Sequence, residues 1–361
     1  MKSKKVLVVD DSAFMRKLIT DILNHHPELD VVATARNGKD AIVKFEKYKP
    51  DVMTMDVEMP EMDGLDALSY IMERKPTPVV MLSSLTKKGT ETTMLAMEKG
   101  AVDFIAKPSG TISVDLYKIK DELIEKVLAA SRANVRPISA FNKPKMNSNL
   151  SANTTPSLPI NRLERLKTNG KTLIVIGTST GGPRALQTVL TRLPATLNAP
   201  ILIVQHMPAG FTHSLAQRLD SLSAISVKEA EDGEILRNNT AYIAPGSYHL
   251  KVKKVGASLA VHLDQTPAVN GHRPSVDVLF ESVSDLSDYN KVAVVMTGMG
   301  ADGANGLFKL KEMGKGTVAA IAESKETCVV FGMPRAAIAT HVVDEVVPVD
   351  QIAETIVKYI P

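Results

Sequence analysis

The stretch Gly177–Gly182, Gly-Thr-Ser-Thr-Gly-Gly, places a single serine, Ser179, among glycines and threonines. A run of apolar, mostly β-branched residues at 172–176 precedes it, and a helical pattern opening at Pro183 follows it. A serine between a strand and a helix becomes an exposed nucleophile when glycines permit a sharp turn. The start of the helix supplies free N–H groups and partial positive charge to a developing oxyanion. The pattern therefore indicates hydrolysis with Ser179 as the nucleophile.

Two phosphate-binding motifs use glycines in a similar way. A P-loop requires lysine followed by serine or threonine after Gly182, where this chain has Pro183 and Arg184. The dinucleotide-binding fingerprint requires glycine at the position of Ser179 and an acidic residue at the end of the next strand, which is absent from the sequence. The nucleophile interpretation is favoured, and it requires a general base.

His206 is the preferred base because it directly follows the apolar run 201–205. The carboxyl ends of parallel strands meet at one edge of a sheet, so His206 is expected within reach of Ser179. Surface, core, turn or capping roles are ordinary for the other candidates, which are His249, His262, His272 and His341.

The acid that orients the base is also expected at this edge. Asp302 follows the strand 291–296 through Thr-Gly-Met-Gly-Ala, and suits either a helix N-cap or a partner of His206. Asp264 is the main competitor. The common α/β-hydrolase order of serine, acid and histidine would pair either aspartate with a later histidine. The sequence favours Asp302.

A second group of polar residues lies near the N-terminus, again where apolar runs end. Asp10 and Asp11 close the first run, and Asp56 closes the third. Three carboxylates at one edge repel one another, and a hard cation such as Mg²⁺ would hold them together. Ser83 and Lys107 end the fourth and fifth runs, where a hydroxyl and an ammonium can bind a phosphoryl group on an aspartate.

The elements that must position these groups alternate between strand and helix in both halves of the chain. Five strands and five helices in 1–133 predict a doubly wound parallel sheet. Residues 170–361 predict a second doubly wound, mainly parallel α/β domain with an inserted β-hairpin at 250–263. The segment 134–169 is expected to be a flexible linker, because 142–159 is rich in Asn, Ser, Thr and Pro.

Composition limits the other classes of function. The chain of 361 residues is long enough for two domains, and its formal net charge of +3 gives no reason to expect a nucleic-acid partner. The single cysteine, Cys328, excludes an internal disulfide framework and fits a reducing compartment. Without a signal-peptide pattern or an apolar run near the roughly 20 residues that span a bilayer, we expect a cytoplasmic protein without membrane insertion.

The first half resembles the receiver domain of two-component response regulators over about residues 4–130. The motifs are Val8-Val9-Asp10-Asp11, Met55-Asp56-Val57-Glu58-Met59-Pro60, Leu82-Ser83-Ser84 and Lys107-Pro108. The resemblance implies that Asp56 accepts phosphate from a histidine kinase, assisted by Mg²⁺ on the three carboxylates. It makes Ser83 and Lys107 the switch pair that contacts the phosphoryl group, with Phe104 as the switch aromatic.

The second half resembles the chemotaxis protein-glutamate methylesterase family (CheB) over essentially all of 170–361. The motifs are Gly177–Gly182, Gln205-His206-Met207-Pro208, Ala244-Pro245-Gly246, Pro274-Ser275-Val276-Asp277, Thr297–Asp302 and Phe331-Gly332-Met333-Pro334. By this resemblance Ser179 is the nucleophile, His206 the base and Asp302 the orienting acid. Thr180 and Met299 match positions lining the site and its oxyanion hole.

The resemblance implies a phosphorylation-activated hydrolase that demethylates glutamate esters of methyl-accepting chemoreceptors and deamidates glutamines, without a cofactor in this domain. We expect the unphosphorylated receiver to cover Ser179, and phosphorylation of Asp56 to loosen that contact. Thr178 stands where the family usually has alanine or glycine. A DNA-binding output would instead predict a short, basic helical domain, and a nucleotide-binding output a phosphate cradle at 177–182.

Overall fold

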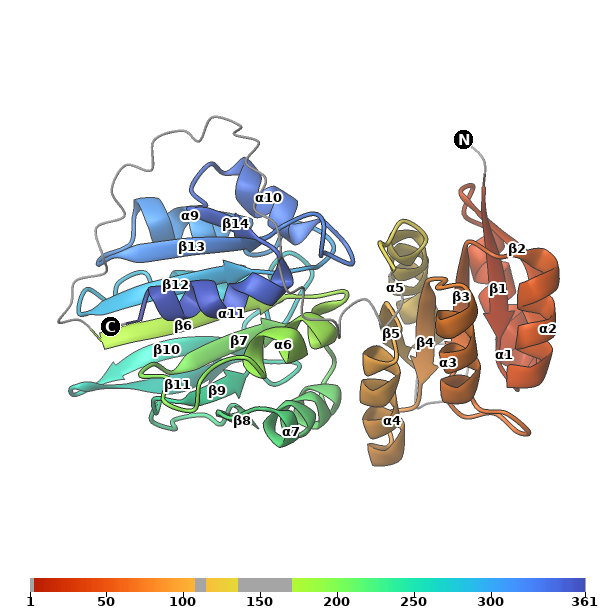
Figure 1. The fold of residues 1–361 in the computed structure, drawn as a ribbon, viewed down its shortest axis with the longest axis horizontal. Coiled ribbons are helices and arrows are strands. Elements are labelled where there is room, and N and C mark those ends of the chain that lie inside the picture. The colour runs from red at the N-terminus through yellow and green to blue at the C-terminus, as the bar shows by residue number, and fades with distance from the viewer. Residues whose placement is uncertain (1–2, 108–114, 136–170, 361) are drawn as a thin grey trace, which may run out of the picture.

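The computed structural model describes residues 3–107, 115–135 and 171–360. It contains two α/β domains, one from red to yellow and the other from green to blue in Figure 1. The spacing of apolar residues in 160–167 predicts a short helix, and this segment and most of the expected linker lie outside the described residues. Among the described residues, no helix is long and apolar enough to cross a membrane.

The first domain is a five-stranded parallel sheet in the order β2-β1-β3-β4-β5. Its strands are β1 (Lys4–Val9), β2 (Leu29–Ala35), β3 (Val52–Asp56), β4 (Val79–Ser83) and β5 (Asp103–Ala106). Its helices are α1 (Ala13–Asn24), α2 (Gly38–Tyr48), α3 (Gly64–Arg74), α4 (Lys87–Glu98) and α5 (Asp115–Ala130). Every residue of β3 and β4 is buried, which explains their almost unbroken apolar sequences. Side-chain oxygens of four N-cap residues fix the starts of α1 to α4: Ser12, Asn37, Asp63 and Thr86.

The second domain has a seven-stranded sheet in the order β14-β13-β12-β6-β7-β9-β8, with all pairs parallel. The strands are β6 (Lys171–Thr178), β7 (Ile201–Gln205), β8 (Ser226–Glu229), β9 (Thr240–Ile243), β12 (Tyr289–Val295), β13 (Val318–Glu323) and β14 (Glu345–Val347). The predicted hairpin is present as a separate antiparallel pair, β10 (His249–Val255) and β11 (Ser258–Asp264). The predicted fold class is confirmed for both domains.

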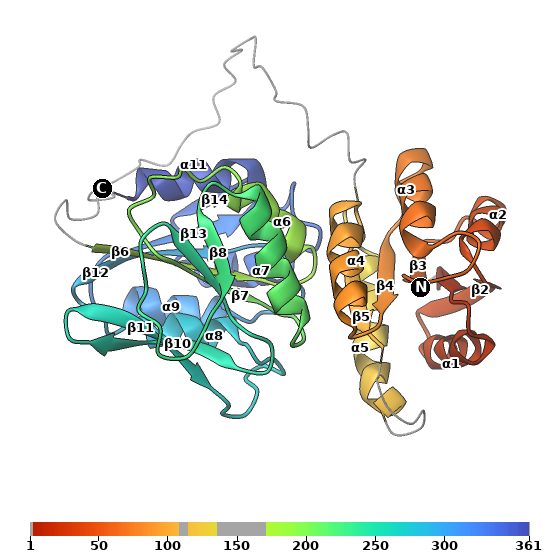
Figure 2. The ribbon, with the colours of Figure 1, turned by 90° about the horizontal axis from the view of Figure 1, so that it is seen from below.

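Helices cover both faces of this sheet. They are α6 (Gly182–Leu190), α7 (Phe211–Leu222), α8 (Val276–Ser282), α9 (Ala304–Glu312), α10 (Met333–Ala339) and α11 (Val349–Lys358). Figure 2 shows α6, α7 and α11 on one face, and α8, α9 and the hairpin on the other. Because β6 lies between β12 and β7, the loops that follow these three strands meet at one edge.

The two domains meet where α4 and β5 face α6 and α7 (Figure 2). The rings of Phe104 and Phe211 pack across this boundary with centroids 4.3 Å apart. Arg218 forms two hydrogen bonds with the Glu98 carboxylate, at 2.5 and 2.8 Å. Buried apolar residues of both domains therefore form one continuous cluster, flanked by polar pairs.

Gly177 and Gly181 serve different purposes in the turn that carries the predicted nucleophile. Gly181 has φ +78°, in the left-handed region that favours glycine. Gly177 is required by space, because a Cβ there would lie 2.2 Å from Val276 Cγ1. The expectation that the flanking glycines allow the sharp turn therefore holds for Gly181, whereas Gly177 lets α8 approach β6.

The contact between Gly177 and Val276 gives a test by double substitution. Gly177→Ala is expected to lower the free energy of unfolding by about 1–3 kcal/mol through overpacking. Adding Val276→Ala removes the overlap, so the double variant should lose less than the sum of the two single losses. Urea unfolding of the four proteins measures this coupling, and strictly additive losses would contradict the packing explanation.

Candidate active site between the two domains

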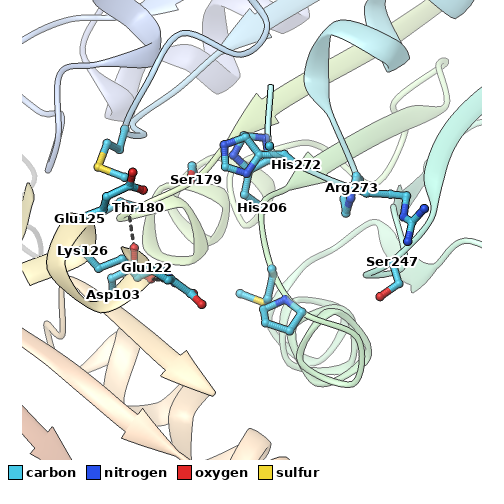
Figure 3. A pocket seen from close by; sticks show the side chains of 15 residues that line it. Asp103, Glu122, Glu125, Lys126, Ser179, Thr180, His206, Ser247, His272 and Arg273 are labelled. Atoms are coloured by element: carbon cyan, nitrogen blue, oxygen red, sulfur yellow. Dashed lines mark hydrogen bonds and ion pairs between the residues drawn. The ribbon is translucent and has the colours of Figure 1, made fainter. Parts of the chain in front are cut away.

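A cavity of about 350 Å³ lies at the domain boundary, over the carboxyl edge of the second sheet (Figure 3). The second domain contributes to its lining Ser179, Thr180, His206, His272 and Met299. The first domain contributes Asp103, Glu122, Glu125 and Lys126. The predicted nucleophile and base thus face a space that both domains enclose.

The backbone of Ser179 is held from three sides. Its N–H donates to the carbonyl of Thr297 at 3.0 Å, and its carbonyl accepts from Gly182 N at 2.7 Å. The side-chain amide of Gln205 donates to the same carbonyl at 3.0 Å. Gly298 approaches so closely that a Cβ on it would lie 2.8 Å from Ser179 Cβ. These contacts fix the turn that follows β6.

His206 and Asp302 are joined by a hydrogen bond of 2.8 Å between Nε2 and Oδ2. Burial alone would raise the pKa of Asp302, but the hydrogen bond and charge attraction of His206, with the N–H of Val276, hold it well below its usual range. An ionised Asp302 keeps the proton on Nε2, so Nδ1 is the nitrogen that can accept one. Nδ1 is buried and has no hydrogen-bond partner among the described residues. Within the described range 171–360, no hydrogen bond joins Ser179 to His206.

The first domain holds the residues next to Ser179. Thr180 Oγ1 donates to Asp103 Oδ2 at 2.5 Å. The N–H of Gly181 donates to the carbonyl of Val102 at 3.1 Å. Met299 lines the same cavity. The two residues expected to line the site therefore lie beside it, and the side chain of Thr180 is bound to the other domain.

At the edge of the first sheet, ligand atoms of Asp10, Asp11 and Asp56 lie within 4.8 Å of one another. Lys107 Nζ bridges two of these carboxylates, at 2.9 Å from Asp10 and 2.6 Å from Asp56. Burial raises the pKa of Asp56 to about 6, although the charge of Lys107 opposes this. A set of carboxylate oxygens is the donor chemistry that Mg²⁺ prefers, so the residues fit this ion.

The other two switch positions point elsewhere. Ser83 Oγ donates to the carbonyl of Gly89 at 3.0 Å and accepts from Thr93 Oγ1 at 2.7 Å, so it is bonded to α4. Phe104 is 2% exposed and packs on Phe211 of the second domain. The structure therefore places one switch residue against α4 and the other at the domain boundary.

The competing candidates have other partners. Asp264 ends β11 and forms a 2.5 Å ion pair with Lys251 on the neighbouring hairpin strand. His262, also in the hairpin, lies 3.4 Å from Asp232. His249 Nε2 lies 3.1 Å from the carbonyl oxygen of Pro267. These three hairpin side chains therefore interact with residues other than Ser179 and His206.

Sequence patterns gave no role near Ser179 to two residues: His272 was considered as a base and set aside, and Glu323 was not considered. His272 stacks on His206, with ring centroids 3.8 Å apart and planes inclined by 12°. Glu323, 1% exposed, accepts hydrogen bonds from Thr297 N at 2.8 Å and from Thr327 Oγ1 at 2.9 Å. Glu323 closes β13, so the strand-end rule that selected His206 could have found it. His272 follows no strand, and its sequence gave no such signal.

Comparison with known proteins identifies the family of each domain. The family model described as CheB methylesterase matches residues 174–356, and that of the response regulator receiver domain matches residues 6–115. The chain belongs to the CheB methylesterase family. It is 57% identical, over 100% of its length and 99% of the relative, to the protein-glutamate methylesterase/protein-glutamine glutaminase of Geobacillus kaustophilus. The corresponding Bacillus subtilis protein is 51% identical over 98% of this chain and 97% of its own.

A solved structure of the same family supports the fold of the second domain. The crystal structure of the Thermotoga maritima CheB methylesterase catalytic domain has 47% sequence identity and a TM-score of 0.50. The match covers 52% of this chain and 98% of that one. The first domain is therefore a receiver, and the second a methylesterase-type catalytic domain.

Glu323 provides a test based on pH. Burial raises its pKa to about 7, from an ordinary value of 4.5. Between these values the folded state keeps a proton that the unfolded chain has released, so the free energy of unfolding falls as pH rises. The loss at full ionisation is up to about 3 kcal/mol. Glu323→Gln should reduce this slope, to which the raised pKa of Asp56 also contributes, whereas Glu312→Gln, at an exposed position, should retain it. Urea unfolding at pH 5 and pH 8 measures both, and an unchanged slope in Glu323→Gln would contradict the assignment.

Proposed function

We propose that this chain is a phosphorylation-controlled hydrolase that demethylates glutamate methyl esters, and deamidates glutamines, on chemoreceptors. Membership in the CheB family and the names of close relatives support this class of activity. The observation that carries the assignment is the buried His206–Asp302 pair beside Ser179, on loops of adjacent strands.

In the proposed mechanism, Ser179 Oγ attacks the ester carbonyl carbon as its proton passes to Nδ1 of His206. Asp302 stabilises the resulting imidazolium through Nε2–H. Backbone N–H groups around Thr180 and Met299, at the start of α6 and after β12, stabilise the tetrahedral oxyanion. The methoxide leaves with the proton from His206 as methanol. Water, deprotonated by the same nitrogen, then attacks the acyl-enzyme and yields glutamate and free Ser179.

Glutamine follows the same course, with ammonia as the leaving group. The scissile carbonyl has the same position on the side chain in the ester and in the amide, so one nucleophile and one base serve both. Each reaction consumes one water molecule from solvent, and Ser179 and His206 relay the protons between the reacting groups.

We further propose that the arrangement of the two domains is the inhibited form. Asp103 accepts from the Thr180 hydroxyl, and the Val102 carbonyl accepts from the N–H of Gly181. The Val102 carbonyl of the receiver therefore already binds an N–H group at the start of α6. The oxyanion of the transition state needs N–H donors at this place. The acidic side chains of Glu122 and Glu125 line the cavity from the same domain. These contacts support occlusion of the site by the receiver.

Phosphorylation can act on this contact because the switch and boundary residues share elements. A histidine kinase is the proposed donor to Asp56, and the three carboxylates would hold Mg²⁺, which neutralises phosphoryl charge. Lys107, which bridges Asp56 and Asp10, follows β5, and β5 carries Phe104 at the boundary. Ser83 is bonded to α4, which carries Glu98. Drawing Ser83 and Lys107 toward a phosphoryl group would shift both elements.

Ser179→Ala tests the nucleophile. In full-length protein supplied with a phosphoryl donor, methanol release from methylated receptor should fall about 10³-fold or more, because the covalent step is lost. Ser287→Ala, at an exposed position, is the matched control and should keep the wild-type rate. Retained activity in Ser179→Ala would overturn the catalytic assignment.

Arg218→Ala tests the inhibitory contact. The Arg218–Glu98 pair is partly exposed, with 38% and 22% of the two side chains accessible, so its loss should shift the docking equilibrium only about two- to five-fold. Methanol release without a phosphoryl donor should rise by this factor, while the fully phosphorylated rate stays unchanged. The charge-exchanged double variant Arg218→Glu/Glu98→Arg should return toward the wild-type basal rate. An unchanged basal rate in Arg218→Ala would contradict a role for this pair in inhibition.

A further inference from the structure

The orientation of the catalytic base is not fixed by Asp302 alone. The Asp302 carboxylate holds His206 at Nε2, which lies across the ring from the Cβ–Cγ bond. Rotation about that bond displaces Nδ1, which lies farther from the rotation axis, more than it displaces Nε2. A hydrogen bond at Nε2 therefore fixes the direction of Nδ1 only in part. Something else must restrict this rotation if Nδ1 is to face Ser179.

The ring of His272 covers one face of the His206 ring. The two planes are inclined by only 12°, and the centroids are 3.8 Å apart (Figure 3). Rotation of His206 would drive its edge into a ring at van der Waals distance. The stack thus blocks rotation of the His206 ring that the Asp302 hydrogen bond alone does not prevent.

His272 is itself held in place by a tight turn. Val269 and His272 exchange backbone hydrogen bonds of 3.0 and 2.9 Å, and the residues between them, Asn270 and Gly271, have φ of +53° and +79°. Two positive φ values are the geometry of a two-residue type I′ turn, which asparagine and glycine favour. The Asn270 amide also donates to Oδ1 of Asp302 at 3.0 Å. One turn therefore contacts both the base and its orienting acid.

The residue after His272 anchors the other end of this turn. Arg273 Nη1 donates to the carbonyls of Gln265 and Thr266 at 2.9 and 3.0 Å. The carbonyl of Arg273 accepts from Ser247 N at 3.1 Å. The guanidinium is thus part of the loop framework, and His272 is presented from a segment tied down at both sides.

We propose that His272 is a positioning residue that holds the His206 ring with Nδ1 directed at Ser179. The inference rests on the hydrolase proposed above. A second contribution comes from charge, because a neutral aromatic face stabilises the imidazolium that His206 becomes in the transition state.

The surroundings of His272 keep it neutral. Burial, followed by repulsion from His206, lowers its pKa to about 4, while the charge of Asp302 opposes this shift and that of Lys126 adds to it. Other charged groups lining the same cavity are Asp103, Glu122, Glu125 and Arg273. At neutral pH the ring can therefore stack on an imidazolium without adding a second positive charge.

The test replaces the ring in the full-length chain, activated with a phosphoryl donor. His272→Leu removes the flat face but retains an apolar side chain, and should lower kcat for methanol release about ten-fold, with KM within two-fold of wild type. His272→Phe keeps the face and should retain kcat within about three-fold. His262→Leu, in the hairpin, is the matched control and should behave as wild type. Thermal unfolding of each variant monitors the fold. If the leucine variant unfolds, His272→Gln makes the same comparison.

Each other outcome would overturn the inference. Full kcat in His272→Leu would mean that the stack does not position the base. Equal losses in His272→Leu and His272→Phe would assign the effect to the imidazole nitrogens, and a raised KM at unchanged kcat would assign it to substrate binding.

Labelling of Ser179 by a fluorophosphonate separates this inference from the proposed function, because it needs an activated serine and no receptor. An unlabelled wild type would defeat the hydrolase itself. A labelled wild type with equally fast labelling of His272→Leu would defeat only the role of His272.

Discussion

A backbone hydrogen bond of 3.1 Å, from Gly181 N–H to the Val102 carbonyl, joins the start of α6 to the receiver. The first N–H groups of a helix have no partner within the helix, so each must find an acceptor elsewhere. In this arrangement the receiver backbone supplies one acceptor, and Asp103 binds the neighbouring Thr180 hydroxyl. A donor that is bound to the receiver cannot also bind an oxyanion. In the proposed mechanism, docking of the receiver and catalysis at Ser179 therefore compete for the same part of the chain.

The proposed catalytic half of the site depends on the Asp302 carboxylate, which is buried and accepts hydrogen bonds from five residues. Asp302 accepts from His206, from Ser275 Oγ, from the N–H groups of Val276 and Asp277, and from Asn270. These donors keep it ionised in spite of burial, which otherwise favours the neutral acid. The same contacts join α8, the turn before it and the loop after β12. Orientation of the base and packing of this part of the domain are thus one network.

Sequence patterns predicted the two α/β domains and the edge where polar residues gather, because strand ends are determined by local apolar runs. They also predicted that Ser179, His206 and Asp302 lie at one edge of a sheet. The structure places these residues on neighbouring loops, because β7, β6 and β12 are adjacent. Helix starts depend on local caps instead: the side chain of Thr86 caps α4, which begins at Lys87.

The contacts that sequence could not predict join distant segments through side-chain geometry. His272 meets His206 only because a turn with two positive φ values folds back over the site. Phe104 meets Phe211 only when the domains dock. Neither pairing produces a periodic pattern in the sequence, because each depends on where whole elements lie relative to one another.

The most direct measurement traps the docked state. Thr90 Oγ1 and Ser214 Oγ lie 2.8 Å apart across the boundary, so Thr90→Cys/Ser214→Cys can form a disulfide, while the native Cys328 is 1% exposed and remains protected. Methanol release would be measured with a phosphoryl donor before and after reduction. Competition for the Ser179 turn predicts an oxidised protein that stays inactive and a reduced protein that regains the phosphorylated wild-type rate. Full activation of the oxidised protein would contradict it.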